Sequence, residues 1–132
     1  MNLYDELKIL LIVSLLSLFL DISTSKKIYN KCIRKKQFLA FLFFHHMISV
    51  FSLIGWLSSN KKVLICYILV LVIIFLHWKL NNAHCYSTDY INKLCKINIK
   101  LRDFYYFLRL KNQMKIIAGS FALIALIRIR KM

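Results

Sequence analysis

Long apolar runs separated by short basic segments constrain this chain of 132 residues more than any other feature. The runs extend from Leu7 to Ile22, from Gln37 to Ser59, from Val63 to His77 and from Ile116 to Ile127. Hydrophobic residues make up 60% of the sequence, more than one soluble core of this size can cover. Such runs are typical of membrane-crossing helices. We therefore expect a single all-α domain, residues 1–132, that forms an integral membrane bundle of three to four transmembrane helices.

The second and third runs form the clearest pair. A tight polar connection at residues 60–62 joins them, and the third run ends in Trp78 and Lys79. An interfacial aromatic followed by a cation that can snorkel is typical of a membrane boundary. We expect spans over about 37–59 and 63–80 that form an antiparallel hairpin.

The first and last runs are shorter. The first opens with Asp5 and Glu6 instead of the basic residues of a secretory signal, so we expect a retained span over about 7–22. The last would extend only roughly 18 Å as a helix, against about 30 Å of hydrocarbon. It is either a fourth span over about 116–127 or a re-entrant or surface helix.

Polar and aromatic residues mix between Leu80 and Lys115. Apolar residues recur there at helical spacing, namely Ile97, Leu101, Phe104, Tyr105 and Leu108. This pattern predicts an amphipathic helix over about 97–110. It would lie along the membrane surface or pack as an ordinary half-buried helix on the bundle.

The charge is strongly basic, with 20 Lys and Arg against 5 Asp and Glu and a net charge of +15. With four spans, the two longer connections would put 14 basic residues on one side and 6 on the other, and the positive-inside rule places the richer side in the cytoplasm. The expected partners are anionic lipid headgroups and other subunits of a large assembly, because no nucleic-acid-binding module is recognisable. The candidate contact residues are Lys26, Lys27, Lys31, Arg34, Lys35, Lys36, Lys93, Lys96, Lys100 and Arg102.

Histidines gather at one predicted depth. His45 lies 15 residues before Asn60 and His77 lies 15 residues after Lys62, so the hairpin would bring them to the same level. His46 would lie close to this level, and the residues that follow the third span, His84 and Cys85, would lie just above it. The simplest interpretation is that neutral histidines hydrogen-bond to serines and fix the helix pair.

Three other interpretations stay open. His45, His46 and His77 are candidate ligands for haem b, and His77, His84 and Cys85 are candidate ligands for zinc or copper. A proton relay would usually recruit carboxylates within the spans, and the second, third and fourth runs have none. We expect no cofactor.

Hydrolytic catalysis has little support. The chain has few carboxylates for acid–base work, and Ser87, Thr88 and Asp89 are better interpreted as a turn or helix cap than as a nucleophile with helpers. Cys85 and Cys95 could pair, although reduced thiols are the rule on a cytoplasmic face. We expect a protein that is not an enzyme.

The middle two fifths of the chain carry a recognisable pattern. Its residues are His45-His46, Phe51, Gly55-Trp56-Leu57, Lys61-Lys62, His77-Trp78, Asn81-Asn82, Cys85, Thr88, Asn92 and Cys95. This stretch resembles small multi-span membrane proteins encoded by large nucleocytoplasmic DNA viruses. The resemblance implies a protein of a virion or virus-factory membrane, and assigns no role to single residues.

Together these features favour a structural protein that organises a membrane, the inner membrane of a virion or an internal host membrane, and links it to a larger assembly through basic loops. The alternative is a small accessory subunit of a respiratory complex in the mitochondrial inner membrane. Both AT-rich viral genomes and AT-rich mitochondrial genomes encode chains rich in Lys, Ile, Asn, Phe and Tyr. The respiratory alternative would give the histidines a haem-related context.

Overall fold

The structure is a computed structural model that describes residues 2–81 and 85–132. Every regular element in these ranges is a helix, which confirms the predicted all-α class. The α-helices are α1 (Leu3–Tyr29), α2 (Lys36–Ile54), α3 (Lys61–Leu80), α4 (Tyr86–Cys95), α5 (Phe104–Phe107) and α6 (Met114–Lys131), with 3-10 turns η1 (Gly55–Leu57) and η2 (Lys111–Gln113).

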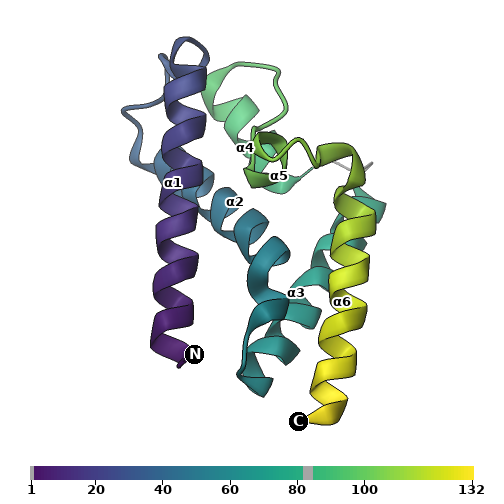
Figure 1. Ribbon diagram of the computed structural model, residues 1–132. Helices are drawn as coiled ribbons and strands as arrows, with labels where there is room; N and C mark the ends of the chain where they lie inside the picture. Colours follow the sequence, from purple (N-terminus) through teal and green to yellow (C-terminus); the bar gives the residue numbers. More distant parts are fainter. Residues whose placement is uncertain (1, 82–84) are drawn as a thin grey trace.

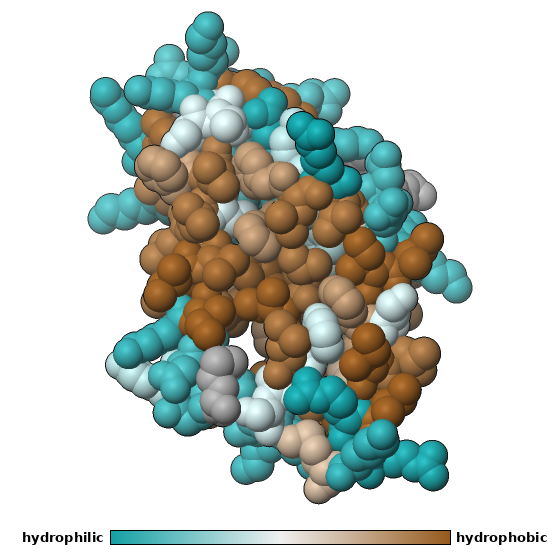
Figure 2. Space-filling model, in the orientation of Figure 1, coloured by the Kyte–Doolittle hydropathy of each residue, from teal (hydrophilic) through white to brown (hydrophobic). Residues whose placement is uncertain are grey.

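Four of these helices are long and apolar enough to cross a membrane: α1, α2 with its η1 extension, α3, and α6 with the η2 turn before it. Figure 2 shows the corresponding belt of hydrophobic residues, with hydrophilic residues at both ends of the visible face. Helix α6 has 18 residues, more than the predicted run of 116–127, and is about 27 Å long. Basic side chains in its last turn can snorkel to the headgroups, so it is long enough for a fourth span.

The long helices pack as two pairs, α1 with α2 and α3 with α6. Helices α2 and α3 are joined by a tight turn and run in opposite directions, as predicted, but each has its larger interface elsewhere (Figure 1). Small residues explain the actual pairing, because they let helix backbones approach closely in lipid. Ala118 and Ala125 are buried on α6, and Ser14 and Ser17 are buried on α1.

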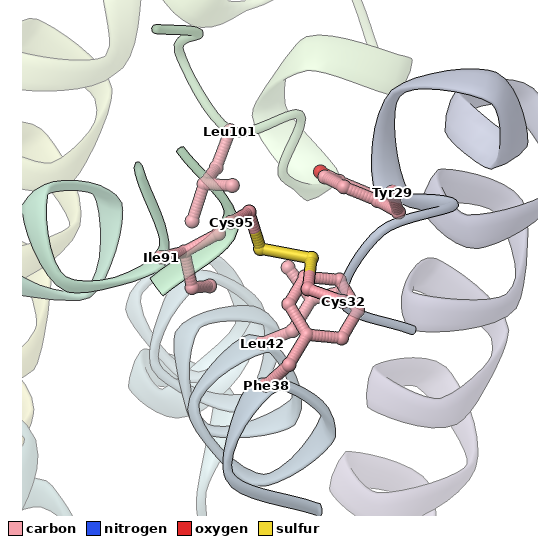
Figure 3. Packing of buried hydrophobic residues seen from close by; sticks show 7 residues of the cluster. All are labelled: Tyr29, Cys32, Phe38, Leu42, Ile91, Cys95 and Leu101. Atoms are coloured by element: carbon pink, nitrogen blue, oxygen red, sulfur yellow. A yellow bond between two sulfur atoms is a disulfide. The ribbon is translucent and has the colours of Figure 1, made fainter. Parts of the chain in front are cut away.

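Two clusters of buried hydrophobic residues hold the pairs. The first lies at the end where α1, α2 and α4 meet, and comprises Tyr29, Cys32, Phe38, Leu42, Ile91, Cys95 and Leu101 (Figure 3). The second lies between α3 and α6, and comprises Leu64, Tyr67, Leu71, Ala118 and Ala125. The bundle therefore has no single central core.

Helix α1 extends to Tyr29, seven residues beyond the predicted end of the first span at residue 22, into the connection between the first two predicted spans. The dihedral angles of Ser25 are not helical, yet the helix continues to Tyr29. Asp21 explains the continuation, since its carboxylate accepts hydrogen bonds from Ser25 Oγ and Tyr29 Oη, each at 3.0 Å. The actual connection to α2 is short.

The prediction that the amphipathic helix lies over residues 97–110 is wrong. Residues 97–103 are not helical, because the side-chain amide of Asn92 exchanges two hydrogen bonds with the backbone of Ile99, at 2.9 and 3.2 Å. Asp103 then accepts a hydrogen bond from the backbone N–H of Tyr106 and starts the short helix α5. The strongly amphipathic helix of this region is α4.

A disulfide joins Cys32 to Cys95, with the two Cα atoms 5.3 Å apart. It connects the turn after α1 to the end of α4, across 63 positions of sequence, and lies inside the first cluster (Figure 3). The sequence left open whether Cys95 pairs with Cys85 or stays reduced, and the structure shows neither, because Cys95 pairs with Cys32. Because Ile91 and Cys95 lie one turn apart, the buried face of α4 carries both a packing residue and a crosslink.

Gly55→Ala tests the close approach at the turn between α2 and α3. A Cβ atom at Gly55 would lie 2.6 Å from Tyr67 Cδ2 and 2.9 Å from Phe51 Cε2, so two packed rings would have to move. We expect the free energy of unfolding to fall by about 1–3 kcal/mol. The measurement is thermal unfolding in detergent micelles, followed by circular dichroism.

Gly119→Ala is the matched control, since a Cβ atom there has no neighbour within 4 Å. Its stability should stay equal or rise slightly, because alanine favours the helix. Equal effects of the two substitutions would contradict the packing around Gly55.

Candidate functional site

Helix α1 turns a polar face, not an apolar one, toward the bundle. Its buried residues are Ser14, Ser17, Asp21, Ser25 and Tyr29, which recur every three or four positions. Exposed leucines and isoleucines occupy much of the remaining surface of the helix. In lipid this arrangement is favourable, because apolar side chains face the hydrocarbon and polar ones find partners between helices.

Asp21 and His46 form the centre of that interface. Both are fully buried, and His46 Nε2 lies 3.2 Å from Asp21 Oδ2. On the other side of the ring, Nδ1 lies 2.7 Å from Ser17 Oγ. A neutral imidazole with its proton on Nε2 would donate to the carboxylate and accept from the serine, which satisfies both ring nitrogens.

Ser17, His46 and Asp21 are the residue types of a hydrolytic triad, but each is 0% exposed. A nucleophile with no surface cannot meet a substrate carbonyl, and the hydroxyl of Ser17 is engaged by the ring. The arrangement can do what interhelical polar contacts do, which is to fix the register and rotation of α1 on α2.

His45 points to a different set of residues, although it is adjacent in sequence. Its Nδ1 lies 3.7 Å from Cys85 Sγ, and its Nε2 lies 3.9 Å from Asp103 Oδ2. Lys111 Nζ approaches the same carboxylate oxygen at 3.6 Å. Within the described residues, His45 Nε2 and Ser49 Oγ are buried without a hydrogen-bond partner, one helical turn apart on α2.

Tyr105 closes this site from the side of α5. Its hydroxyl lies 3.0 Å from Ser52 Oγ, and the hydroxyl of Tyr67 donates to the carbonyl of Ser52 at 2.9 Å. Burial raises the pKa of Tyr105 above its ordinary value, so the phenol stays protonated at physiological pH. Two tyrosines from different helices therefore contact one residue of α2.

His77, the third histidine of the predicted cluster, accepts a hydrogen bond from the backbone. The N–H of Tyr86 donates to His77 Nε2 at 3.1 Å. Since Cys85 precedes Tyr86, His45 and His77 both contact the start of α4. His84 lies outside the described residues.

The described geometry does not fit haem b. Both nitrogens of His46 are taken by Ser17 and Asp21, and His45 and His77 contact different residues instead of facing each other across an open space. Nor do residues 2–81 and 85–132 bring three or more His, Cys, Asp or Glu side chains together as metal ligands.

The basic residues selected from the sequence gather at one end of the molecule, which we call the basic cap. They are Lys26, Lys27, Lys31, Arg34, Lys35, Lys36, Lys93, Lys96, Lys100 and Arg102, and all except the half-buried Arg102 are exposed. Hydrogen bonds tie the cap together: Lys35 Nζ donates to the carbonyl of Leu94 at 3.1 Å, and Arg102 donates to that of Thr24 at 3.5 Å.

Two residues of the site were missed at the level of sequence. Asp21 lies within the first apolar run and was not selected, although its spacing from Ser14 and Ser17 is that of one helix face. Asp103 offered no signal, since its contact with His45 depends on the fold of residues 97–110.

Comparisons with models of known protein families, with curated proteins and with solved structures found no match. The class therefore rests on the structure, which has four helices long and apolar enough to cross a membrane, paired through polar and small residues. This is the architecture of a multi-span helical membrane protein.

Asp21→Ala tests the polar interface between α1 and α2. Removing the carboxylate leaves His46, Ser25 and Tyr29 buried without their acceptor, so the free energy of unfolding should fall by about 2–4 kcal/mol. Asp21→Asn keeps the size and one acceptor oxygen and should cost less. Thermal unfolding in micelles measures both.

Asp5→Ala removes a carboxylate from the first turn of the same helix, where no described partner depends on it, and should change stability by less than about 0.5 kcal/mol. If Asp21→Ala were as mild as this control, the buried contact would not hold the helices together.

Proposed function

We propose that this chain is a non-enzymatic structural protein of a membrane-bound assembly, which it joins through the basic cap. The observation that carries the proposal is the position of ten basic residues on one end of a bundle whose helices are long enough to span a membrane. These residues come from segments more than 50 positions apart in sequence. Their meeting on one surface is a property of the fold.

Crosslinks give this surface a defined shape. The Cys32–Cys95 disulfide and the bond from Lys35 to Leu94 hold α4 against the turn after α1. A preorganised charged surface loses less conformational entropy on binding than charges on flexible loops. This rigidity supports attachment to a fixed partner layer in addition to general attraction to lipid.

Few carboxylates offset the positive charge at the surface of this region. Asp21 and Asp103 are buried inside the protein, where they contact histidines, whereas Asp89 on α4 is exposed. Clusters of Lys and Arg beside a membrane attract anionic headgroups and acidic proteins alike. We therefore propose an acidic protein layer as the partner, with anionic headgroups as additional ligands.

The setting that follows from the sequence resemblance is the inner membrane of a virion, with a capsid layer as the acidic partner. A respiratory complex of the mitochondrial inner membrane is the alternative setting. The described contacts of His45, His46 and His77 lend no support to the haem-related branch of that alternative.

Charge reversal tests the proposal. A variant with Lys26, Lys27, Lys31 and Lys36 changed to Glu alters exposed cap residues and leaves the hydrogen-bonding Lys35 and Arg102 in place. We expect it to insert into the membrane but to lose co-purification with the assembly by at least about tenfold, because four attractive contacts become repulsive. Quantitative mass spectrometry of gently solubilised native membrane measures the loss.

The control reverses four charges at the opposite end, Lys61, Lys62, Arg130 and Lys131, and should leave co-purification unchanged. Retention of the Cys32–Cys95 disulfide shows that each variant is folded. Unchanged incorporation of the cap variant, or equal loss in both variants, would refute attachment through the basic cap.

A further inference from the structure

One free thiol lies at the start of α4, outside the disulfide. Cys85 is half-buried and occupies the N-cap position of this ten-residue helix. The other free cysteine among the described residues is Cys66, which is exposed on the apolar surface of α3. The two thiols therefore differ in surroundings, and only Cys85 has polar neighbours in the described structure.

Those neighbours form a chain of acid–base groups. His45, with 9% of its surface exposed, directs Nδ1 at the thiol from 3.7 Å, and Asp103 lies 3.9 Å from the opposite ring nitrogen. Thiols and hydroxyls are activated for acyl transfer by this order of contacts, in which the nucleophile contacts a base and the base contacts a carboxylate on its other side.

Two buried atoms beside this chain lack partners. His45 Nε2 and Ser49 Oγ have no hydrogen-bond partner in the described structure, although both residues are more than nine-tenths buried. Leaving a buried polar atom unpaired costs about 1–3 kcal/mol, so such an atom calls for an explanation, and a catalytic role is one such explanation. Both belong to the face of α2 that carries the contact with Cys85.

Direct exchange with the Cys32–Cys95 disulfide is not the use of this thiol. The nearest described disulfide partner on the same helix, Cys95, is at the other end of α4, about 15 Å away along its axis. A metal site is also unsupported within the described residues. An acyl group remains as the ligand class that the chemistry and the location both favour.

The location is the end of a span. Cys85 follows closely on α3, whose last residue Leu80 has 85% of its surface exposed, and it precedes Tyr86, which is 60% exposed. Exposed leucine and tyrosine at the end of an apolar helix are typical of the zone between headgroups and hydrocarbon. If α3 spans a membrane, a thiol at this end of the helix would lie level with the ester or thioester carbonyl of an acyl donor whose chain stays in the bilayer.

We propose that Cys85 is a self-acylating thiol, which takes a long-chain acyl group from a thioester or a phospholipid ester with His45 as the base. The thiol proton moves to His45 Nδ1 as sulfur attacks the donor carbonyl. The donor's C–S or C–O bond then breaks, and the same proton passes to the leaving thiol or alcohol. Asp103 is a positioning residue, which stabilises the imidazolium of His45 after it takes the thiol proton and before it gives that proton to the leaving group.

This modification goes beyond attachment through the basic cap and does not depend on it. An acyl chain on Cys85 would fasten the start of α4 to the bilayer, while the Cys32–Cys95 disulfide fastens its end to the bundle. Both ends of the helix that carries part of the cap would then be fixed.

The test uses the purified full-length chain in two arms. In the first, palmitoyl-CoA is added to the protein in micelles. In the second, the protein is reconstituted in phosphatidylcholine vesicles with isotopically labelled acyl chains and no thioester. Intact mass spectrometry counts the acyl groups, and hydroxylamine, which cleaves thioesters, confirms the linkage.

We expect one hydroxylamine-sensitive acyl group on Cys85, and the arm in which it appears identifies the donor. Cys66→Ser should keep the modification and Cys85→Ser should lose it. Absence of acylation in both arms, or equal labelling of Cys66 and Cys85, would overturn the proposal.

The role of the base is tested by chemical rescue. His45→Ala should slow acylation by about a hundredfold, and added imidazole should restore the rate. Asp103→Asn should slow acylation in the chain that keeps His45. When it is combined with His45→Ala, it should not change the rate of the imidazole-rescued reaction, because free imidazole is not positioned by Asp103. A His45→Ala chain that retains its disulfide but shows no rescue, or no slowing, would remove His45 from the reaction.

Discussion

The pairing of polar groups inside a hydrocarbon solvent is the constraint on which the rest of this fold depends. A carboxylate within a membrane span must find partners, and Asp21 finds three: His46 on α2, and Ser25 and Tyr29 further along its own helix. These bonds attach α1 to α2 and extend α1 to Tyr29. Tyr29 then packs in the cluster that contains Cys32, and the disulfide of Cys32 positions α4. At the start of α4, Cys85 contacts His45, which precedes His46 on α2.

The disulfide and the charge distribution place the basic end in different compartments. The positive-inside rule puts the end with more Lys and Arg in the cytoplasm, whereas disulfides persist where the environment is oxidising. Cys32 and Cys95 lie among the residues of the basic cap, so one of the two rules is overridden in this protein. Either the disulfide forms on a cytoplasmic face, or the basic end lies outside the cytoplasm against the usual charge bias. A measurement of membrane topology distinguishes the two.

The spans were predictable from sequence because hydropathy acts over whole helices and needs no knowledge of partners. Helix pairing was not predictable, because it depends on which helix each small residue faces. Ala118 and Ser17 are buried against particular neighbours, and nothing in the sequence says which neighbours these are. The segment 97–110 had the periodicity of a helix, and of its five apolar residues at that spacing Leu101 and Tyr105 are buried, whereas Leu108 is exposed. Its backbone is held by side-chain contacts from Asn92 and Asp103, which periodicity does not report. The hairpin argument placed Cys85 just above the level of His45, and the two side chains do approach, with Sγ 3.7 Å from Nδ1. The approach of Asp103 to His45 could not be found in this way, because it depends on the irregular backbone before α5.

Four helices are long and apolar enough to cross a membrane, and Figure 1 shows both termini at the end of the bundle opposite α4. If all four cross, the basic cap lies on one side of the membrane and both termini lie on the other. Single cysteines introduced at Lys31, Lys100, Lys62 and Arg130 in proteoliposomes, labelled with a membrane-impermeant maleimide, test it most directly. In a four-span bundle, positions 31 and 100 react from one side of the membrane and positions 62 and 130 react from the other. Labelling of position 130 together with the cap would show that α6 does not cross, and would contradict the four-span bundle.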